Sequence, residues 1–121
     1  MKKILVVDDE LVLRMLIRGT LEDSYEIFEA EDGYAGLDLA RTVLPDLIVL
    51  DMMMPGITGL EVCQKLKQDP ATSSIKILLL TAKSQQRDRE AATAAGVDYF
   101  LAKPFSPANL IVLVGDILKQ D

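Results

Sequence analysis

Short runs of apolar residues alternate along the chain with longer stretches in which apolar residues recur every three or four positions. Four of the short runs are rich in β-branched, aromatic and leucine residues, which is typical of strands buried on both faces of a sheet. They span Lys3–Asp8, Asp46–Asp51, Ile75–Thr81 and Asp98–Leu101. A fifth run, Tyr25–Ala30, mixes apolar and charged residues and predicts a strand at an edge of the sheet.

The stretches between these runs predict amphipathic helices, because their apolar residues fall on one face of a helix. The buried faces of the first three helices are expected to consist of Leu13, Leu16, Ile17, Thr20 and Leu21; of Leu37, Ala40 and Leu44; and of Val62, Cys63 and Leu66. The second helix is expected to stop before Pro45, and the third at Asp69-Pro70.

Two more helices are predicted in the last third of the chain. The fourth spans Gln86–Gly96, with Gly96 placed as its C-terminal stop. The fifth runs from about Pro107 to Lys119, with Ser106 as its N-cap and proline in the first helical position.

Five βα units in succession predict an α/β fold, in which helices cover both faces of a mostly parallel sheet through right-handed crossovers. We expect the five strands to adopt the doubly wound, flavodoxin-like order 2-1-3-4-5. The 121 residues fit one domain, so residues 1–121 are expected to form a single unit. In this topology a functional site lies beyond the carboxyl ends of strands 1 and 3.

Composition and charge remove several classes of function. The net charge of −6 argues against direct binding to nucleic acid, which needs a basic field. The chain contains no histidine, which excludes histidine-based acid–base catalysis and histidine-ligated metals. Its apolar runs are too short for an export signal or a bilayer span, and Cys63 has no cysteine partner. We therefore expect a cytoplasmic protein that does not insert into a membrane.

Polar residues gather where the predicted strands end. Asp8-Asp9 close strand 1, Asp51 closes strand 3, Thr81 closes strand 4, and Lys103 follows strand 5. Three carboxylates in a small space repel one another, so a proton or a cation must enter. Oxygen ligands without histidine or cysteine favour a hard cation, most plausibly Mg²⁺. A carboxylate beside that ion can attack phosphorus and form an aspartyl-phosphate, with Lys103 and Thr81 as donors to the phosphoryl oxygens.

Each of these residues also has a purely structural interpretation. Asp8 or Asp9 can serve as N-cap of the first helix, and Asp51 can be a turn residue before Met54-Pro55-Gly56. A threonine at a strand end and a surface lysine are both common. The set as a whole argues for a site, because chance does not place all of these residues at one edge in the matching strand order.

The ordered motifs resemble those of the receiver domains of response regulators over essentially the whole chain. The matching segments are Leu5–Glu10 (LVVDDE), Pro45–Gly56 (PDLIVLDMMMPG), Leu80–Ala82 (LTA) and Lys103–Phe105 (KPF). Each motif alone is weak, whereas the ordered set is specific. The resemblance implies a phosphoprotein of a two-component phosphorelay, which a histidine kinase or a histidine phosphotransfer protein phosphorylates.

The resemblance also implies a role for individual residues. Asp51 would be the phosphoacceptor, Asp9 would bind Mg²⁺ directly, and Asp8 would act largely through water. The backbone carbonyl of Met53 would complete the metal ligands. Lys103 would pair with the phosphoryl group, ahead of a cis bond to Pro104, and Thr81 with Phe100 would form the switch pair. The only catalysis implied is the chain's own phosphoryl uptake and slow autodephosphorylation.

Three other functions deserve comparison. A phosphomonoester hydrolase of a related fold carries Asp-x-Asp after strand 1, whereas this chain has adjacent Asp8-Asp9. A flavin carrier needs a loop rich in hydroxyls and amides there, and Asp8-Asp9-Glu10 would repel its phosphate. A phosphorylation-independent adaptor typically lacks one of the five site residues, and none is missing here. The signalling switch is therefore the preferred interpretation, as a stand-alone regulator or as the receiver of a longer protein.

The predicted fifth helix carries more apolar residues than one buried stripe requires. Leu110, Val114 and Ile117 supply the stripe, which leaves residues such as Ile111 and Leu113 to face outward. We expect them on the surface formed by helix 4, strand 5 and helix 5. That surface would change on phosphorylation and bind a second copy of the chain or a downstream protein.

Overall fold

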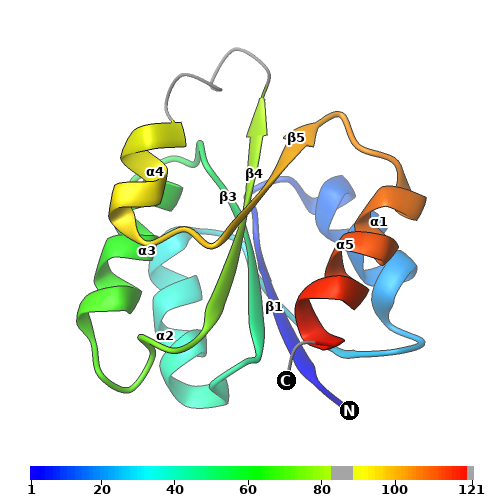
Figure 1. The fold of residues 1–121 in the computed structure, drawn as a ribbon, viewed down its shortest axis with the longest axis horizontal. Coiled ribbons are helices and arrows are strands. Elements are labelled where there is room, and N and C mark those ends of the chain that lie inside the picture. Colours follow the sequence, from blue (N-terminus) through cyan, green and yellow to red (C-terminus); the bar gives the residue numbers. More distant parts are fainter. Residues whose placement is uncertain (83–88, 120–121) are drawn as a thin grey trace.

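The computed structural model describes residues 1–82 and 89–119, and in them strands and helices alternate strictly (Figure 1). The strands are β1 (Lys3–Val7), β2 (Glu26–Ala30), β3 (Leu47–Asp51), β4 (Lys76–Ala82) and β5 (Tyr99–Lys103). The helices are α1 (Leu11–Leu21), α2 (Gly33–Val43), α3 (Gly59–Gln68), α4 (Arg89–Ala95) and α5 (Pro107–Lys119). The predicted elements are thus confirmed, with strand ends shifted by one or two residues.

All neighbouring strands pair in parallel, in the order β2-β1-β3-β4-β5, which confirms the predicted doubly wound topology. β1 lies between β2 and β3, and β2 forms an edge as its mixed pattern predicted. Because all strands run the same way, their carboxyl ends share one edge of the sheet. The register pairs Asp51 with Leu80 and Ala82 with Lys103, so the ends of β3, β4 and β5 stay nearly level.

Successive strand residues point to opposite faces, and each face carries its own core. Helices α2, α3 and α4 cover one face; the buried residues of that core include Val7, Leu50 and Leu79 from the strands and Leu37 and Cys63 from the helices. Helices α1 and α5 cover the other face; the buried residues of that core include Val6, Val49 and Leu80 from the strands and Ile17 and Val114 from the helices. In Figure 1 the two groups of helices lie on either side of the sheet. Burial on both faces explains the continuous apolar runs of β1, β3 and β4.

Two expected core positions lie at the surface instead. Leu16 is 44% exposed, because α1 packs on the sheet mainly through Ile17 and Leu21. Leu44 is 53% exposed and forms the C-cap of α2 in the left-handed region, at φ 52°. Since Pro45 follows immediately, the helix cannot continue through Leu44, and its side chain turns away from the buried face.

The helix ends follow the predicted local signals where the structure describes them. Ser106 accepts a hydrogen bond from the backbone N–H of Asn109 at the start of α5. Gly96 follows α4 with φ +102°, the left-handed conformation expected of a helix stop. The predicted start of the fourth helix, from Gln86 to Asp88, lies outside the described residues. Within residues 1–82 and 89–119, no helix is both long and apolar enough to span a membrane.

Candidate functional site

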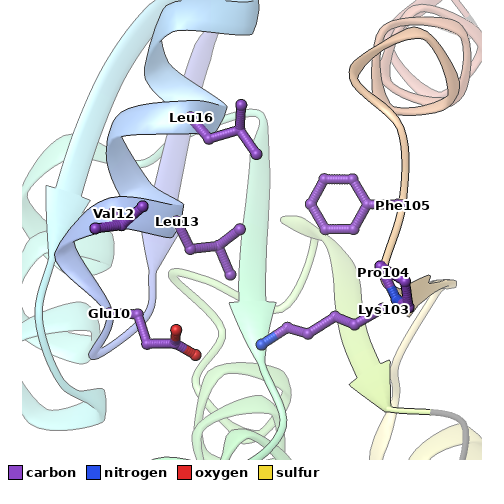
Figure 2. A pocket seen from close by; sticks show the side chains of 7 residues that line it. All are labelled: Glu10, Val12, Leu13, Leu16, Lys103, Pro104 and Phe105. Carbon is purple, nitrogen blue, oxygen red and sulfur yellow. The ribbon is translucent and has the colours of Figure 1, made fainter.

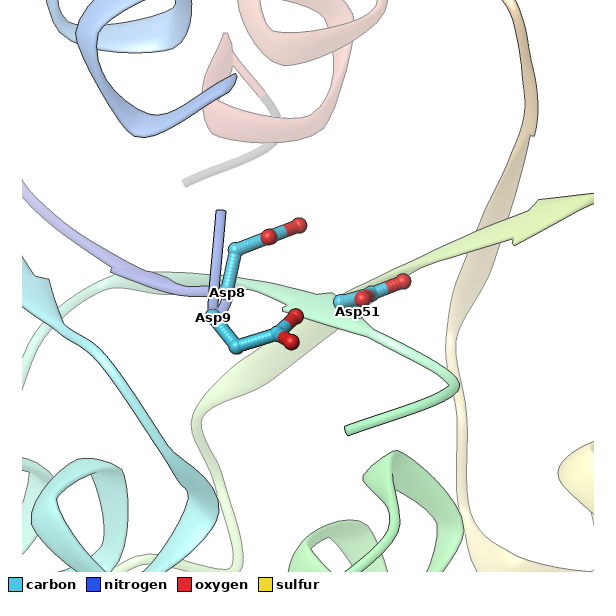
Figure 3. Close-up of side chains that lie close together, drawn as sticks. All are labelled: Asp8, Asp9 and Asp51. Carbon is cyan, nitrogen blue, oxygen red and sulfur yellow. The ribbon is translucent and has the colours of Figure 1, made fainter. Parts of the chain in front are cut away.

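Three carboxylates converge at the carboxyl edge of the sheet. Asp8 and Asp9 follow β1, and Asp51 is the last residue of β3, so two neighbouring strands deliver all three groups. Figure 3 shows the three side chains lying close together, and one carboxylate oxygen from each lies within 4.8 Å of the others. Asp8 and Asp51 are buried, whereas Asp9 is exposed. The structure therefore brings together the three acidic residues that the sequence singled out.

Lys103 supplies a positive charge to this cluster. Its Nζ donates a hydrogen bond to Oδ1 of Asp51 at 3.0 Å and lies 3.8 Å from Oδ2 of Asp8. Lys103 ends β5, and the Lys103–Pro104 peptide bond is cis, as the resemblance implied. Burial alone would lower the pKa of Lys103, but the hydrogen bond and charge of Asp51 outweigh it and raise the pKa. The ammonium group therefore stays charged next to the carboxylates.

Burial raises the pKa of both inner carboxyl groups. The pKa of Asp8 rises to about 6, mainly because the group is buried, and the nearby charge of Asp51 adds to this effect. The pKa of Asp51 is also raised by burial, against the hydrogen bond from Lys103 and one from the backbone N–H of Met53. A second positive charge near these groups would relieve the strain of holding them ionised together.

Two buried oxygens of the site have no hydrogen-bond partner among the described residues. They are Oδ2 of Asp8 and Oγ1 of Thr81, which belong to side chains with exposed fractions of 0% and 1%. A buried polar atom without a partner is costly, so each marks a place where a ligand atom fits. The carboxylate oxygens of the cluster, among them this Oδ2 without a hydrogen bond, match a small hard cation such as Mg²⁺. The Thr81 hydroxyl is free to donate to an oxyanion bound at Asp51.

The alternative role of Asp8 or Asp9 as N-cap of the first helix does not hold in the structure. The N-cap of α1 is Glu10, whose side chain makes no capping hydrogen bond, so neither Asp8 nor Asp9 occupies that position. Asp8 does accept a hydrogen bond from the backbone N–H of Glu10 through Oδ1, at 2.8 Å. This bond orients the carboxylate and leaves Oδ2 turned toward Lys103.

A pocket of about 420 Å³ opens beside the acidic cluster, between α1 and the segment after β5. Figure 2 shows Glu10 and Lys103 facing each other across it, with the apolar side chains above them in this view. The pocket is lined by Glu10, Val12, Leu13, Leu16, Lys103, Pro104 and Phe105. The sequence pattern does not predict this pocket, because the periodicity of α1 places Leu16 in the core. Lys103 is shared by the pocket and the acidic cluster, so a molecule in the pocket reaches the edge of the site.

The predicted switch residues lie on adjacent strands. Thr81 is buried in β4, and Phe100 in β5 is partly buried against the core formed with α2, α3 and α4. The guanidinium carbon of Arg89, the first residue of α4, lies 4.9 Å from the centre of the Phe100 ring. This cation–π contact joins α4 to β5. The ring involved belongs to Phe100, which the resemblance to receiver domains makes one of the two switch residues.

The expected apolar surface on α5 requires one correction. Leu113 is partly buried against the core shared with α1, so it does not face outward. The exposed apolar residues of α5 are instead Ile111 and Val112, with exposed fractions of 51% and 63%. Leu110, Val114 and Ile117 are buried as predicted, and Leu113 widens their stripe.

Comparison with known proteins identifies relatives over nearly the whole chain. A family model described as "Response regulator receiver domain" matches residues 4–115. The chain is 43% identical over 120 residues to the alkaline phosphatase synthesis transcriptional regulatory protein PhoP of Bacillus subtilis, covering 98% of this chain and 49% of PhoP. It is 41% identical over 118 residues to the response regulator PleD of Caulobacter vibrioides, covering 97% of this chain and 26% of PleD.

Solved structures give the same result for the fold. The chemotaxis protein CheY4 of Vibrio cholerae superimposes with a TM-score of 0.91 at 31% identity, covering 97% of this chain and 98% of CheY4. The chain thus spans about half the length, or less, of PhoP and PleD but nearly the full length of CheY4.

Proposed function

The chain belongs to the response-regulator receiver family, and from that premise we propose that Asp51 is the residue through which it is phosphorylated. A receiver is a switch that phosphorylation activates within a two-component system, and this chain is such a switch. The observation that carries the assignment of Asp51 is its contact with Lys103, at 3.0 Å, inside a cluster with Asp8 and Asp9. We take residues 1–121 as one receiver domain.

The proposed reaction transfers a phosphoryl group from a phosphohistidine of a histidine kinase or a histidine phosphotransfer protein. A carboxylate oxygen of Asp51 forms the new O–P bond while the N–P bond of the donor breaks, and the electron pair remains on the imidazole nitrogen. Lys103 is already in place to pair with a phosphoryl oxygen, and the free hydroxyl of Thr81 can donate to another. Hydrolysis of the acyl phosphate returns the carboxylate, so the chain catalyses only its own phosphorylation and its slow reversal.

We assign Mg²⁺ to the cluster of Asp8, Asp9 and Asp51, with the backbone carbonyl of Met53 as a further ligand. When bound, the ion supplies positive charge that offsets the repulsion between these carboxylates and the phosphoryl oxygens. Oδ2 of Asp8 accepts no hydrogen bond from the described residues, and the cluster consists of carboxylates alone; both observations support this choice over a softer metal.

The switch is proposed to run from Thr81 to Phe100. A phosphoryl group at Asp51 adds a dianion whose oxygens draw the Thr81 hydroxyl toward them, because that hydroxyl has no other partner among the described residues. The space that Thr81 leaves lets the ring of Phe100 turn inward and release Arg89. The surface made by α4, β5 and α5 then changes, and the exposed Ile111 and Val112 on α5 suit an apolar contact with a downstream protein or a second copy.

The phosphodonor is proposed to dock on the start of α1. Four apolar side chains there are between 44% and 78% exposed, namely Leu11, Val12, Met15 and Leu16. Two of them line the pocket that ends at Lys103, so a donor packed on this face can direct its phosphohistidine toward Asp51.

The single free cysteine and the phosphohistidine chemistry suit a cytoplasmic location.

Phosphorylation with acetyl phosphate tests the assignment of Asp51. In the presence of MgCl2, we expect the chain to gain one phosphoryl group by intact mass, which hydroxylamine then removes. Asp51→Asn should gain none, whereas Asp38→Asn, at an exposed position on α2, should behave as wild type. If Asp51→Asn gained as much phosphoryl group by intact mass as wild type does, the assignment would be overturned.

A further inference from the structure

Arg14, on α1, contacts the peptide group that joins Asp8 to Asp9. Its Nη1 donates a hydrogen bond to the carbonyl oxygen of Asp8 at 2.6 Å. That carbonyl belongs to the peptide bond between the two aspartates, and the peptide unit is planar. Fixing the carbonyl therefore also fixes the amide of Asp9 and the Cα atoms of both aspartates, which lie in the same plane.

Glu29, on β2, holds Arg14 in this position. The Nε of Arg14 donates to Oε1 of Glu29 at 3.1 Å, and the Arg14 side chain is only 11% exposed. Glu29 pairs in register with Val6, two residues before Asp8. Hydrogen bonds from Arg18 and from Arg14 lower the pKa of Glu29, so its carboxylate remains charged. Arg14 is thus fixed at one nitrogen by the edge strand while another nitrogen reaches the site.

Arg18 also forms an ion pair with Glu29 but does not contact the acidic cluster. Its Nε donates to Oε2 of Glu29, and its Nη2 donates to the carbonyl of Ile27, toward the opposite end of β2. Both arginines therefore form an ion pair with the same carboxylate, and Arg18 also lies 3.9 Å from Glu22. Only Arg14 extends from that carboxylate to the backbone of the acidic cluster.

We propose that Arg14 is a positioning residue for the cation site, acting through the Asp8–Asp9 peptide and not through direct contact with the ion. This inference rests on the proposed function, since it takes the three aspartates to bind Mg²⁺. A hydrogen bond from a charged donor is stronger than a neutral one, so the guanidinium resists rotation of the peptide. Contacts of this kind behind metal ligands are typically worth 10- to 100-fold in affinity.

Titration of the full chain with MgCl2 by calorimetry tests the proposal, with Arg14→Met compared against Arg18→Met. Both variants lose an ion pair with Glu29, so their losses in melting temperature should be similar. We expect the Kd for Mg²⁺ to rise about tenfold or more in Arg14→Met, while it stays within twofold of wild type in Arg18→Met. The amide resonance of Asp9 should shift in Arg14→Met alone.

The outcomes separate this inference from the proposed function. If the wild type does not bind Mg²⁺, the cation site itself is wrong. If the wild type binds Mg²⁺ and Arg14→Met has the same Kd, or if both variants weaken binding equally, the positioning role of Arg14 is overturned. Should Arg14→Met fail to fold, Arg14→Lys decides, because a single ammonium group replaces the fork that spans Glu29 and Asp8. A Kd unchanged in Arg14→Lys would then overturn the proposal.

Discussion

Lys103 and Asp51 meet across β4, at a distance of 3.0 Å between Nζ and Oδ1, although they lie 52 residues apart in the sequence. β3 ends at Asp51 and β5 ends at Lys103, with β4 paired between them. The hydrogen bond and charge of Lys103 oppose the burial that raises the pKa of Asp51. Lys103 thus favours the ionised form of this buried carboxyl group against the effect of burial.

Replacing Lys103 with methionine should raise the pKa of Asp51 further, because only the hydrogen bond from the backbone N–H of Met53 then opposes burial and the charge of Asp9. The carboxyl carbon resonance of Asp51, followed against pH in chelator without Mg²⁺, measures this directly. We expect its midpoint to move to higher pH in Lys103→Met. Lys119→Met, at an exposed position in the last turn of α5, is the control. An unmoved midpoint in Lys103→Met would show that the contact has no electrostatic effect.

Asp8 should make the unliganded fold less stable as the pH rises from about 4 to about 6. Its pKa is about 6 in the folded chain against 3.8 without burial, so over this interval the folded state binds a proton that the unfolded state has lost. Asp8→Asn removes this cost. In chelator, the variant should exceed wild type in unfolding free energy by about 1–3 kcal/mol above pH 6.

That advantage should shrink as the pH falls toward 4, because the wild-type carboxyl group is then protonated in the folded chain. Urea unfolding at several pH values measures the difference. Asp38→Asn is again the exposed control. An advantage of Asp8→Asn that grows on acidification would contradict the raised pKa.

Mg²⁺ should stabilise the unphosphorylated chain, since it offsets the repulsion between the three aspartates. At ten times its dissociation constant, a ligand that binds only the folded state adds about 1.4 kcal/mol. We expect the melting temperature to rise with millimolar MgCl2 in wild type and to stay constant in Asp9→Ala, with NaCl at matched ionic strength as the control. Equal melting of wild type with and without MgCl2 would refute the cation site.

Gly59, the first residue of α3, should tolerate no side chain. A Cβ there would lie 2.3 Å from the carbonyl oxygen of Asp51 and 2.9 Å from Cα of Met52, and both are backbone atoms that cannot rotate away. Gly59→Ala should therefore lower the unfolding free energy by roughly 1–3 kcal/mol and slow phosphorylation. Gly19→Ala is the matched comparison, because a Cβ added at Gly19, in α1, would have nothing within 4 Å.

In Gly19→Ala we expect the unfolding free energy to rise by about 0.5–1 kcal/mol, as is usual when alanine replaces glycine inside a helix. Urea unfolding of both variants checks the pair. If both substitutions changed the unfolding free energy in the same direction, the close approach of Gly59 to Asp51 would not be what excludes a side chain there.

The sequence was sufficient to predict the fold and to predict that the acidic residues lie close together, because both predictions follow from where the strands end. Asp8, Asp9, Asp51, Thr81 and Lys103 all follow or close apolar runs, and parallel strands place such ends at one edge. The roles assigned to these residues stay predictions. What the pattern could not predict were contacts made by long side chains across the fold.

Arg14 illustrates that limit. In the sequence it is a polar position on an amphipathic helix, and only the packing of α1 against β2 shows that its guanidinium reaches the carbonyl of Asp8. Leu16, Leu44 and Leu113 were misplaced for a related reason. Helical periodicity gives the direction of a side chain but not how far the neighbouring element extends to cover it, nor where a following proline ends the helix.

The α5 surface gives the last prediction, in which adjacent residues should respond differently to the same change. Val112 is 63% exposed, whereas Leu113 is partly buried against the core shared with α1. Val112→Glu should leave the melting temperature nearly unchanged and weaken self-association or target binding of the phosphorylated chain, because it places a charge on an apolar contact. Leu113→Glu should lower the melting temperature, because a carboxylate then enters the core side of α5. Thermal unfolding separates the two variants, and sedimentation with beryllofluoride as the phosphoryl mimic follows association. If the wild type stays monomeric with the mimic and Val112→Glu binds a downstream target as wild type does, Ile111 and Val112 do not form the contact surface.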